Sequence, residues 1–193
     1  MYSEYIGKLK QALVDTKFFK ENATSEFTSY EEGMEAFVNA VLKVKRENRQ
    51  LFFIGNGGSS AIASHMTADF MKNGGMKTYS LYDSAVMTCI SNDYAYEEVF
   101  SKQLGFLVNK GDMLVAISSS GNSGNIVNAI NTVKHKGGKV VTLSGFKADN
   151  EIKVMGDYSV YVPVEHYGIV ESVHNLILQQ VVDTILDIDG VAV

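Results

Sequence analysis

A run of apolar residues followed by a glycine-rich turn constrains this chain most. Residues 51–54 are apolar and include two phenylalanines, which predicts a buried strand. The segment Gly55-Asn56-Gly57-Gly58-Ser59-Ser60 follows, and its glycines allow a sharp turn and a close approach to a ligand. We expect the two serines to cap a helix over residues 61–72. This arrangement forms an anion site, because free N–H groups and the positive end of the helix dipole point to one spot.

The same pattern recurs further along the chain. Residues 113–117 are apolar and predict a strand, and residues 126–136 predict a helix. The segment between them, Ser118-Ser119-Ser120-Gly121-Asn122-Ser123-Gly124-Asn125, is rich in hydroxyl groups and glycine. One such loop is a modest signal, but two in one short chain favour a bound phosphate or sugar phosphate.

Strands alternate with helices along most of the chain. The sequence predicts five strands, over residues 51–54, 77–82, 113–117, 139–144 and 158–162. Further helices are predicted over residues 3–19, 29–46, 97–108 and 167–187. Alternating βαβ units imply a parallel sheet covered on both faces. We therefore predict an α/β fold: a three-layer αβα sandwich around a five-stranded parallel sheet. It forms a single domain, with a helical N-terminal part (1–48) and a core (49–193).

Composition and charge limit the class of protein. The chain has 193 residues and a net charge of −5, which argues against direct nucleic-acid binding, since that requires a basic face. No apolar run approaches the roughly 18 residues of a membrane span, and the N-terminus lacks a signal-peptide pattern. We therefore expect a cytoplasmic protein with no membrane partner. The single cysteine, Cys89, lies in an apolar context and is expected to be a buried small hydrophobe.

The two loops are also compatible with roles that involve no phosphosugar. The first loop has a Gly-x-Gly pattern and Asp83 ends the next strand, as in a dinucleotide site, but Ser60 stands where the third glycine belongs. Neither loop contains Gly-Lys-Ser/Thr, so a P-loop is excluded, and we expect no nucleotide cofactor. Both loops could also be tight turns with helix caps and no ligand.

Two groups of polar side chains are candidates for chemistry. His65 and Asp69 are four residues apart and share a helix face, either as metal ligands, as an acid/base pair or as a surface ion pair. Glu171 and His174 lie near the start of the last helix, which is otherwise mostly apolar, and Gln179 follows two turns after Glu171. Such residues line a cavity or are buried with partners, and a lone histidine there is usually a core residue.

Several motifs together resemble one known family. They are Ile54-Gly55-Asn56-Gly57-Gly58-Ser59-Ser60, His65, Ile90-Ser91-Asn92-Asp93-Tyr94, Glu97-Glu98-Val99-Phe100-Ser101-Lys102-Gln103 and Ile117-Ser118-Ser119-Ser120-Gly121-Asn122-Ser123. In this order they resemble the sugar isomerase (SIS) domain, and within it the phosphoheptose isomerase group. The resemblance runs from the second predicted helix to the C-terminus. It implies a homotetramer with active sites between subunits, in which the N-terminal helices help assembly.

The resemblance also implies a phosphosugar ligand. The serine loop of the family holds the phosphate, here through Ser118, Ser119, Ser120 and Ser123. The glycine-rich loop holds sugar hydroxyls, here through Asn56, Gly57, Gly58 and Ser59, with Asn92 and Asp93 nearby. Phosphoheptose isomerases convert sedoheptulose 7-phosphate to glycero-manno-heptose 7-phosphate, and they often bind zinc.

The zinc and catalytic positions of the group are where this chain differs from it. The group has His, Glu four residues later, then Gln and, eight residues after that, His. His65 matches the first histidine, but Asp69, Glu171 and Gln179 replace the other three residues. The resemblance thus implies zinc ligation by this set, and a His/Asp/Glu set suits zinc or another divalent ion.

The catalytic roles follow from what isomerisation requires, which is a base and an acid. We expect Asp69 or Glu171 to be the base. We expect His65 or His174 to be the acid, or to bind a metal ion with the carboxylates that takes the place of the acid. The amide of Gln179 cannot transfer a proton at neutral pH, so the role of the second histidine in the group is vacant or has moved.

Two hypotheses for the function follow. The first is a sugar-phosphate aldose–ketose isomerase of phosphoheptose isomerase type with an altered catalytic pair. The alternative is a non-catalytic SIS module that binds a phosphosugar or a protein partner, such as the type that associates with the bacterial replication initiator. Gln179 favours the alternative. The titratable residues favour the isomerase, because a protein that only binds needs no such cluster.

Overall fold

The computed structural model describes residues 2–191 and contains a seven-stranded sheet with the order β2-β1-β7-β6-β5-β3-β4. The strands are β1 (Lys17–Lys20), β2 (Ser25–Glu26), β3 (Gln50–Gly55), β4 (Lys77–Ser80), β5 (Met113–Ser118), β6 (Lys139–Gly145) and β7 (Tyr158–Val162). The strands from β7 to β4 are parallel, whereas β1 pairs antiparallel with both β7 and β2. The predicted α/β class with a parallel sheet is therefore confirmed, with two more strands than predicted.

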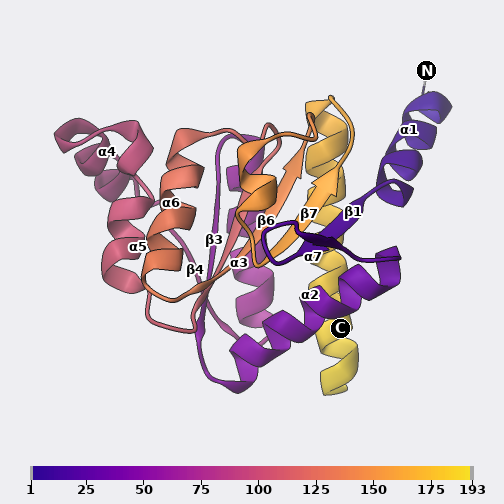
Figure 1. Ribbon diagram of the computed structural model, residues 1–193. Helices are drawn as coiled ribbons and strands as arrows, with labels where there is room; N and C mark the ends of the chain where they lie inside the picture. The colour runs from indigo at the N-terminus through magenta and orange to yellow at the C-terminus, as the bar shows by residue number, and fades with distance from the viewer. Residues whose placement is uncertain (1, 192–193) are drawn as a thin grey trace.

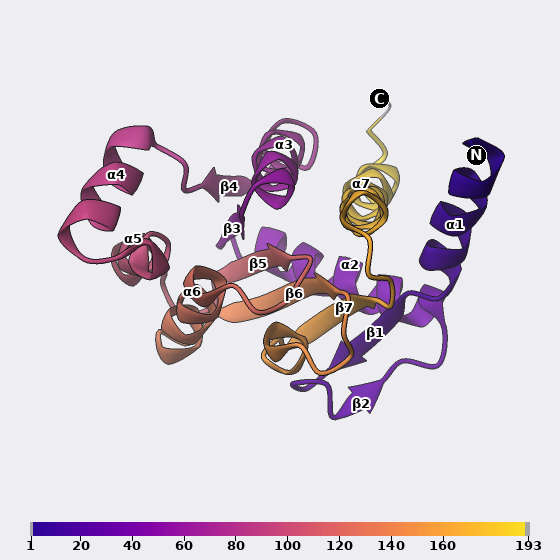
Figure 2. The same ribbon diagram turned by 90° about the horizontal axis from the view of Figure 1, so that it is seen from above.

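Helices cover both faces of the sheet, as Figure 2 shows. They are α1 (Tyr2–Val14), α2 (Tyr30–Arg46), α3 (Gly58–Lys72), α4 (Ser84–Asp93), α5 (Ser101–Leu107), α6 (Gly124–His135) and α7 (Tyr167–Asp189), with short 3-10 helices η1 (Tyr96–Glu98) and η2 (Glu151–Val154). The residues of α2, α3 and α7 pack on one face of the sheet, and those of α5, α6 and η2 pack on the other. This arrangement is the three-layer sandwich that the sequence predicts.

The apolar run of β3 is buried on both sides. Leu51 and Phe53 belong to the core cluster under α2, α3 and α7, while Phe52 and Ile54 belong to the cluster under α5 and α6. Successive side chains of a strand point to opposite faces, so a central parallel strand is apolar throughout. The glycine-rich turn therefore starts from a fixed point in the core.

The N-terminal prediction of two helices is wrong in one part. The first helix ends at Val14, and β1 follows it, where a helix through residue 19 was predicted. Phe18 and Phe19 are both buried, on opposite faces of β1, and pairing with β7 satisfies the backbone of that strand. A Cβ added to Gly33 of α2 would lie 2.3 Å from Phe18, so the helix packs directly on this strand.

The helix α4 projects from the body of the molecule, at the upper left of Figure 1. None of its residues is buried, and Cys89 is exposed, with its Sγ 3.6 Å from the Asp93 carboxylate. The expectation of a buried Cys89 is wrong, because apolar neighbours in sequence need not face a core. Among the helices of residues 2–191, none combines the length and the apolar composition that a membrane-spanning segment needs.

Candidate active site

The two predicted loops meet at the ends of the neighbouring strands β3 and β5. They line a pocket of about 130 Å³ together with the start of α7. The lining residues are Asn56, Ser59, Ser118, Ser119, Ser120, Ser123, Tyr167 and Glu171. The structure thus brings the four predicted phosphate-binding serines together with one predicted catalytic carboxylate.

The first loop turns at Gly57, which has φ 55° and ψ −122°. A residue with a side chain rarely adopts this conformation. The helix α3 begins at Gly58 and has no side-chain cap, so the prediction that serines cap a helix from residue 61 is wrong. Ser59 is instead buried in the first turn, and the Ser60 hydroxyl donates to the Gly57 carbonyl at 2.7 Å. Uncapped N–H groups at this end of α3 remain available to a ligand.

The carboxylate of Glu171 lies against the first residue of α3. A Cβ added to Gly58 would be 2.3 Å from Glu171 Oε2, so a larger residue here would displace the carboxylate. The carboxylate lies at the N-terminal end of α3, where the helix dipole is positive. The two glycines thus allow the turn and admit Glu171 to the pocket.

The serine loop is held by its own backbone. The Ser118 carbonyl accepts a hydrogen bond from the Gly121 N–H at 3.0 Å, and Gly121 has φ +69°. A Cβ added there would lie 2.1 Å from Asn150 Oδ1. Ser123 precedes α6 without capping it through its side chain. The loop therefore presents hydroxyl groups beside a second uncapped helix N-terminus, as an anion site requires.

The side-chain amides of Asn56 and Asn125 join the two loops, a contact that the sequence did not predict. Asn56 Nδ2 donates to Asn125 Oδ1, and Asn125 Nδ2 donates to Asn56 Oδ1, both at 2.9 Å. The Tyr96 hydroxyl also donates to Asn56 Oδ1, at 3.0 Å. The only signal in the sequence is that both asparagines belong to the two loops. Their pairing fixes the distance between the loops.

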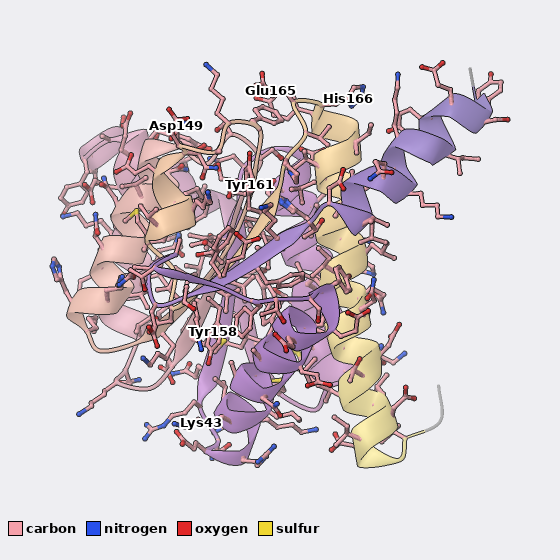
Figure 3. The ribbon with its side chains drawn as sticks, turned by 45° about the vertical axis from the view of Figure 1, so that its right-hand side comes forward. Lys43, Asp149, Tyr158, Tyr161, Glu165 and His166 are labelled. Carbon is pink, nitrogen blue, oxygen red and sulfur yellow. The ribbon has the colours of Figure 1, made fainter. Side chains whose placement is uncertain are left out.

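Tyr167 borders the pocket and is itself held by a strained residue. Its ring meets Phe146 edge-on, with the centroids 4.7 Å apart. Phe146 has φ +59°, which is unfavourable for a residue with a side chain. The Tyr161 hydroxyl donates to the Phe146 carbonyl at 2.7 Å. Figure 3 shows Tyr161 below Glu165 and His166, which lie at the top of the view where the chain enters α7.

The other predicted site residues lie outside this pocket. His65 Nε2 is 3.2 Å from Asp69 Oδ2, and Asp69 is about 16 Å along α3 from its first residue, given 1.5 Å per residue. Asn92 and Asp93 are exposed at the end of α4 and hydrogen-bond to each other at 2.9 Å. Gln179 donates to Asp183 at 2.9 Å.

The predicted zinc ligands do not form a cluster within one chain. Across residues 2–191, no three or more His, Cys, Asp or Glu side chains are close enough to hold a metal ion together. His65 and Asp69 offer two ligands, while Glu171 is at the other end of α3. A single chain therefore does not fit zinc at this position.

His174 is a core residue and does not reach the pocket. Its side chain is fully buried, and its Nε2 lies 3.1 Å from the Ser144 carbonyl oxygen. Burial lowers the pKa of His174 from 6.5 to about 4, so the ring is neutral at physiological pH. The ring therefore lies outside the pocket, and its burial gives no support to the predicted role of His174 as the acid.

Comparison with known proteins identifies the fold family. The protein-family model of the SIS domain matches residues 19–145. This chain belongs to the SIS domain family. The phosphoheptose isomerase of Nitratidesulfovibrio vulgaris is 35% identical to this SIS domain protein over 164 residues, which are 82% of this chain and 74% of the relative. The phosphoheptose isomerase of Helicobacter pylori strain P12 is 31% identical over 172 residues, 86% of this chain and 89% of the relative.

Solved structures of the same group share the fold. Phosphoheptose isomerase from Neisseria gonorrhoeae superposes on this SIS domain with a TM-score of 0.77 and 25% identity, covering 95% of this chain and 96% of that one. The enzyme from Francisella tularensis superposes with a TM-score of 0.83 and 24% identity, covering 96% of both chains. The resemblance seen in the sequence motifs is confirmed, both in the family and in the fold.

Proposed function

We propose that this SIS domain protein is a sugar-phosphate aldose–ketose isomerase of phosphoheptose isomerase type. Its substrate would be sedoheptulose 7-phosphate, and its product glycero-manno-heptose 7-phosphate. The observation that carries the proposal is the carboxylate of Glu171 in the same pocket as the serine loop. The similarity to phosphoheptose isomerases over most of the chain supports it.

The size of the pocket suits the phosphate group alone. Sites that enclose a whole small molecule usually measure about 300–1,000 Å³, and this pocket measures about 130 Å³. The sugar would therefore extend outward past Glu171 and Tyr167. The lining residues include no lysine or arginine, so serine hydroxyls and the N–H groups of α6 would hold the dianion.

Ser119 provides a direct test of the phosphate site. Its hydroxyl is buried and has no hydrogen-bond partner within the described residues, so it is free for a ligand. We expect Ser119→Ala to weaken binding of inorganic phosphate about tenfold or more, the effect of one hydrogen bond to a charged group. Titration calorimetry measures this change. Ser172→Ala is the control, since that hydroxyl is exposed and donates to the Gly168 carbonyl. Equal phosphate affinity of Ser119→Ala and the native protein would contradict the assignment.

Glu171 is the candidate base. It would take a proton from the carbon next to the carbonyl and return it to the carbonyl carbon. The proton of the hydroxyl on the first carbon would move to the carbonyl oxygen, and the two transfers together convert the ketose to the aldose. The N–H groups at the start of α3 would stabilise the negative charge of the enediolate between these steps. Asp69, the other predicted base, lies outside the pocket of its own chain, so the geometry favours Glu171.

We also propose that the protein forms a homotetramer in the cytoplasm, with sites completed between copies. His65, Asp69, Asn92 and Asp93 carry polar groups outside the pocket of their own chain, and α4 has no buried residue. A neighbouring copy would bring such groups to the sugar that leaves the pocket. Zinc would need ligands from that copy as well, so no step above depends on it.

One experiment distinguishes isomerisation of the sugar phosphate from binding without turnover. The purified protein is incubated with sedoheptulose 7-phosphate in deuterated water, with and without zinc, and both the product and the deuterium at the carbon next to the carbonyl are measured. An isomerase incorporates deuterium, because the abstracted proton exchanges with solvent. Binding of the sugar phosphate without product or exchange would instead favour the non-catalytic SIS module that Gln179 suggests.

A further inference from the structure

His174 is an unusual residue for its position in α7. Its side chain is fully buried, on a helix face formed otherwise by apolar residues. Within residues 2–191, its Nδ1 atom has no hydrogen-bond partner. An unpaired buried polar atom lowers stability, and an apolar side chain of similar size would avoid this cost. Packing alone therefore does not explain a histidine here.

Among the described residues, His174 makes one hydrogen bond, and this bond determines which ring nitrogen carries the proton. Its Nε2 is 3.1 Å from the carbonyl oxygen of Ser144, and a carbonyl oxygen can only accept. The proton is therefore on Nε2, and Nδ1 carries none in the neutral ring. His174 acts as a donor to the backbone at the end of β6.

That backbone position supports the serine loop. Ser144 pairs with Ser118 across β5 and β6, and the N–H of the next residue, Gly145, donates to the Ser119 carbonyl at 3.0 Å. A Cβ added to Gly145 would lie 2.7 Å from Val170 of α7. The start of α7 thus touches the base of the loop by packing at Val170 and by a hydrogen bond at His174.

The same helix turn carries the candidate base. Glu171 precedes His174 by three residues, so the two side chains lie on adjacent positions of one helix face. A shift of α7 relative to β6 would move Glu171 relative to the serines. Reactions that depend on two oriented groups lose rate steeply when their spacing changes.

We propose that His174 is a positioning residue that couples the serine loop to Glu171 by donating a hydrogen bond to the Ser144 carbonyl. This proposal rests on one part of the proposed function, namely that the serine loop binds phosphate. It predicts that losing the donor impairs phosphate binding, although His174 itself touches no ligand.

Variants of His174 test the coupling with inorganic phosphate as the probe. His174→Leu fills the space without a donor, and we expect it to weaken phosphate binding about tenfold, the effect of losing one ordered hydrogen bond in the site. His174→Gln places an amide N–H near the position of Nε2, and we expect near-native affinity. His174→Asn is shorter and should resemble His174→Leu. The rescue by Gln but not by Asn is the readout that a purely structural role would not give.

A matched control distinguishes the loss of the His174 hydrogen bond from a general loss of fold stability. Ile185 is fully buried in the same helix, far from the loop in sequence, and Ile185→Ala should destabilise the fold without changing phosphate affinity. Native phosphate affinity in His174→Leu would overturn the proposal, as would equal weakening in Ile185→Ala or no detectable binding by the native protein. Phosphate binding does not require turnover. Native protein that binds phosphate without isomerising sedoheptulose 7-phosphate would therefore contradict the proposed function and leave this coupling standing.

Discussion

Glu171→Gln should reduce kcat for sedoheptulose 7-phosphate about a thousandfold, within the range that a general base contributes. The amide keeps the shape of the side chain beside Gly58 but cannot accept a proton at neutral pH. Phosphate affinity should change little, because the serine loop is intact. Initial rates and phosphate titrations of the purified variant measure both quantities.

Two further variants make this result specific to Glu171. Glu165→Gln makes the same chemical change at an exposed position outside the pocket, and it should retain native kcat. Asp69→Asn removes the other carboxylate that the sequence suggests as the base. If Asp69→Asn lost activity and Glu171→Gln kept it, the base would be Asp69 from a neighbouring copy, and the role of Glu171 would be wrong.

Acid should destabilise the native protein through His174. The folded state holds the pKa of this ring at about 4, below the unfolded value of 6.5, because burial disfavours the charged form. The unfolded chain therefore binds this proton more tightly. The resulting contribution of His174 to the free energy of unfolding amounts to about 3 kcal/mol. It is fully present above pH 6.5 and is lost as the pH falls from 6.5 to about 4.

Urea unfolding from pH 7.5 to 4 measures this contribution. His174→Gln does not titrate, so the difference in unfolding free energy between the native protein and this variant should change with pH, whereas carboxylates contribute equally to both. His135→Gln is the control, because His135 is exposed at the end of α6. Parallel pH profiles of the native protein and His174→Gln would show that His174 is protonated as easily in the folded state as in the unfolded chain.

The main strands and both ligand loops could be predicted from the sequence, because their signals lie in residues that are neighbours along the chain. The strands β3 and β5 are apolar runs, and each ligand loop follows one of them directly, so these strand ends and loops could be located from local sequence alone. Glu171 was one of several candidates, because its approach to Gly58 depends on how α7 meets α3.

Features that depend on distant pairing could not be predicted. Phe18 and Phe19 fit a helical spacing with the apolar residues before them, and only the free edge of β7 makes their segment a strand. Asn125 and Tyr96 reach Asn56 from different elements, and no spacing in the sequence indicates this contact. Cys89 has apolar neighbours along the chain but lies exposed on a helix that has no buried residue.

The hairpin of β1 and β2 has a consequence for solubility. It occupies the edge of β7 and ends the sheet with the two-residue strand β2, whose Glu26 forms an ion pair with Lys17 of β1 at 3.1 Å. Charged residues on a short border strand discourage other chains from adding to a sheet. A chain shortened to begin after this hairpin would expose the backbone of β7, and such molecules would join through that strand into aggregates.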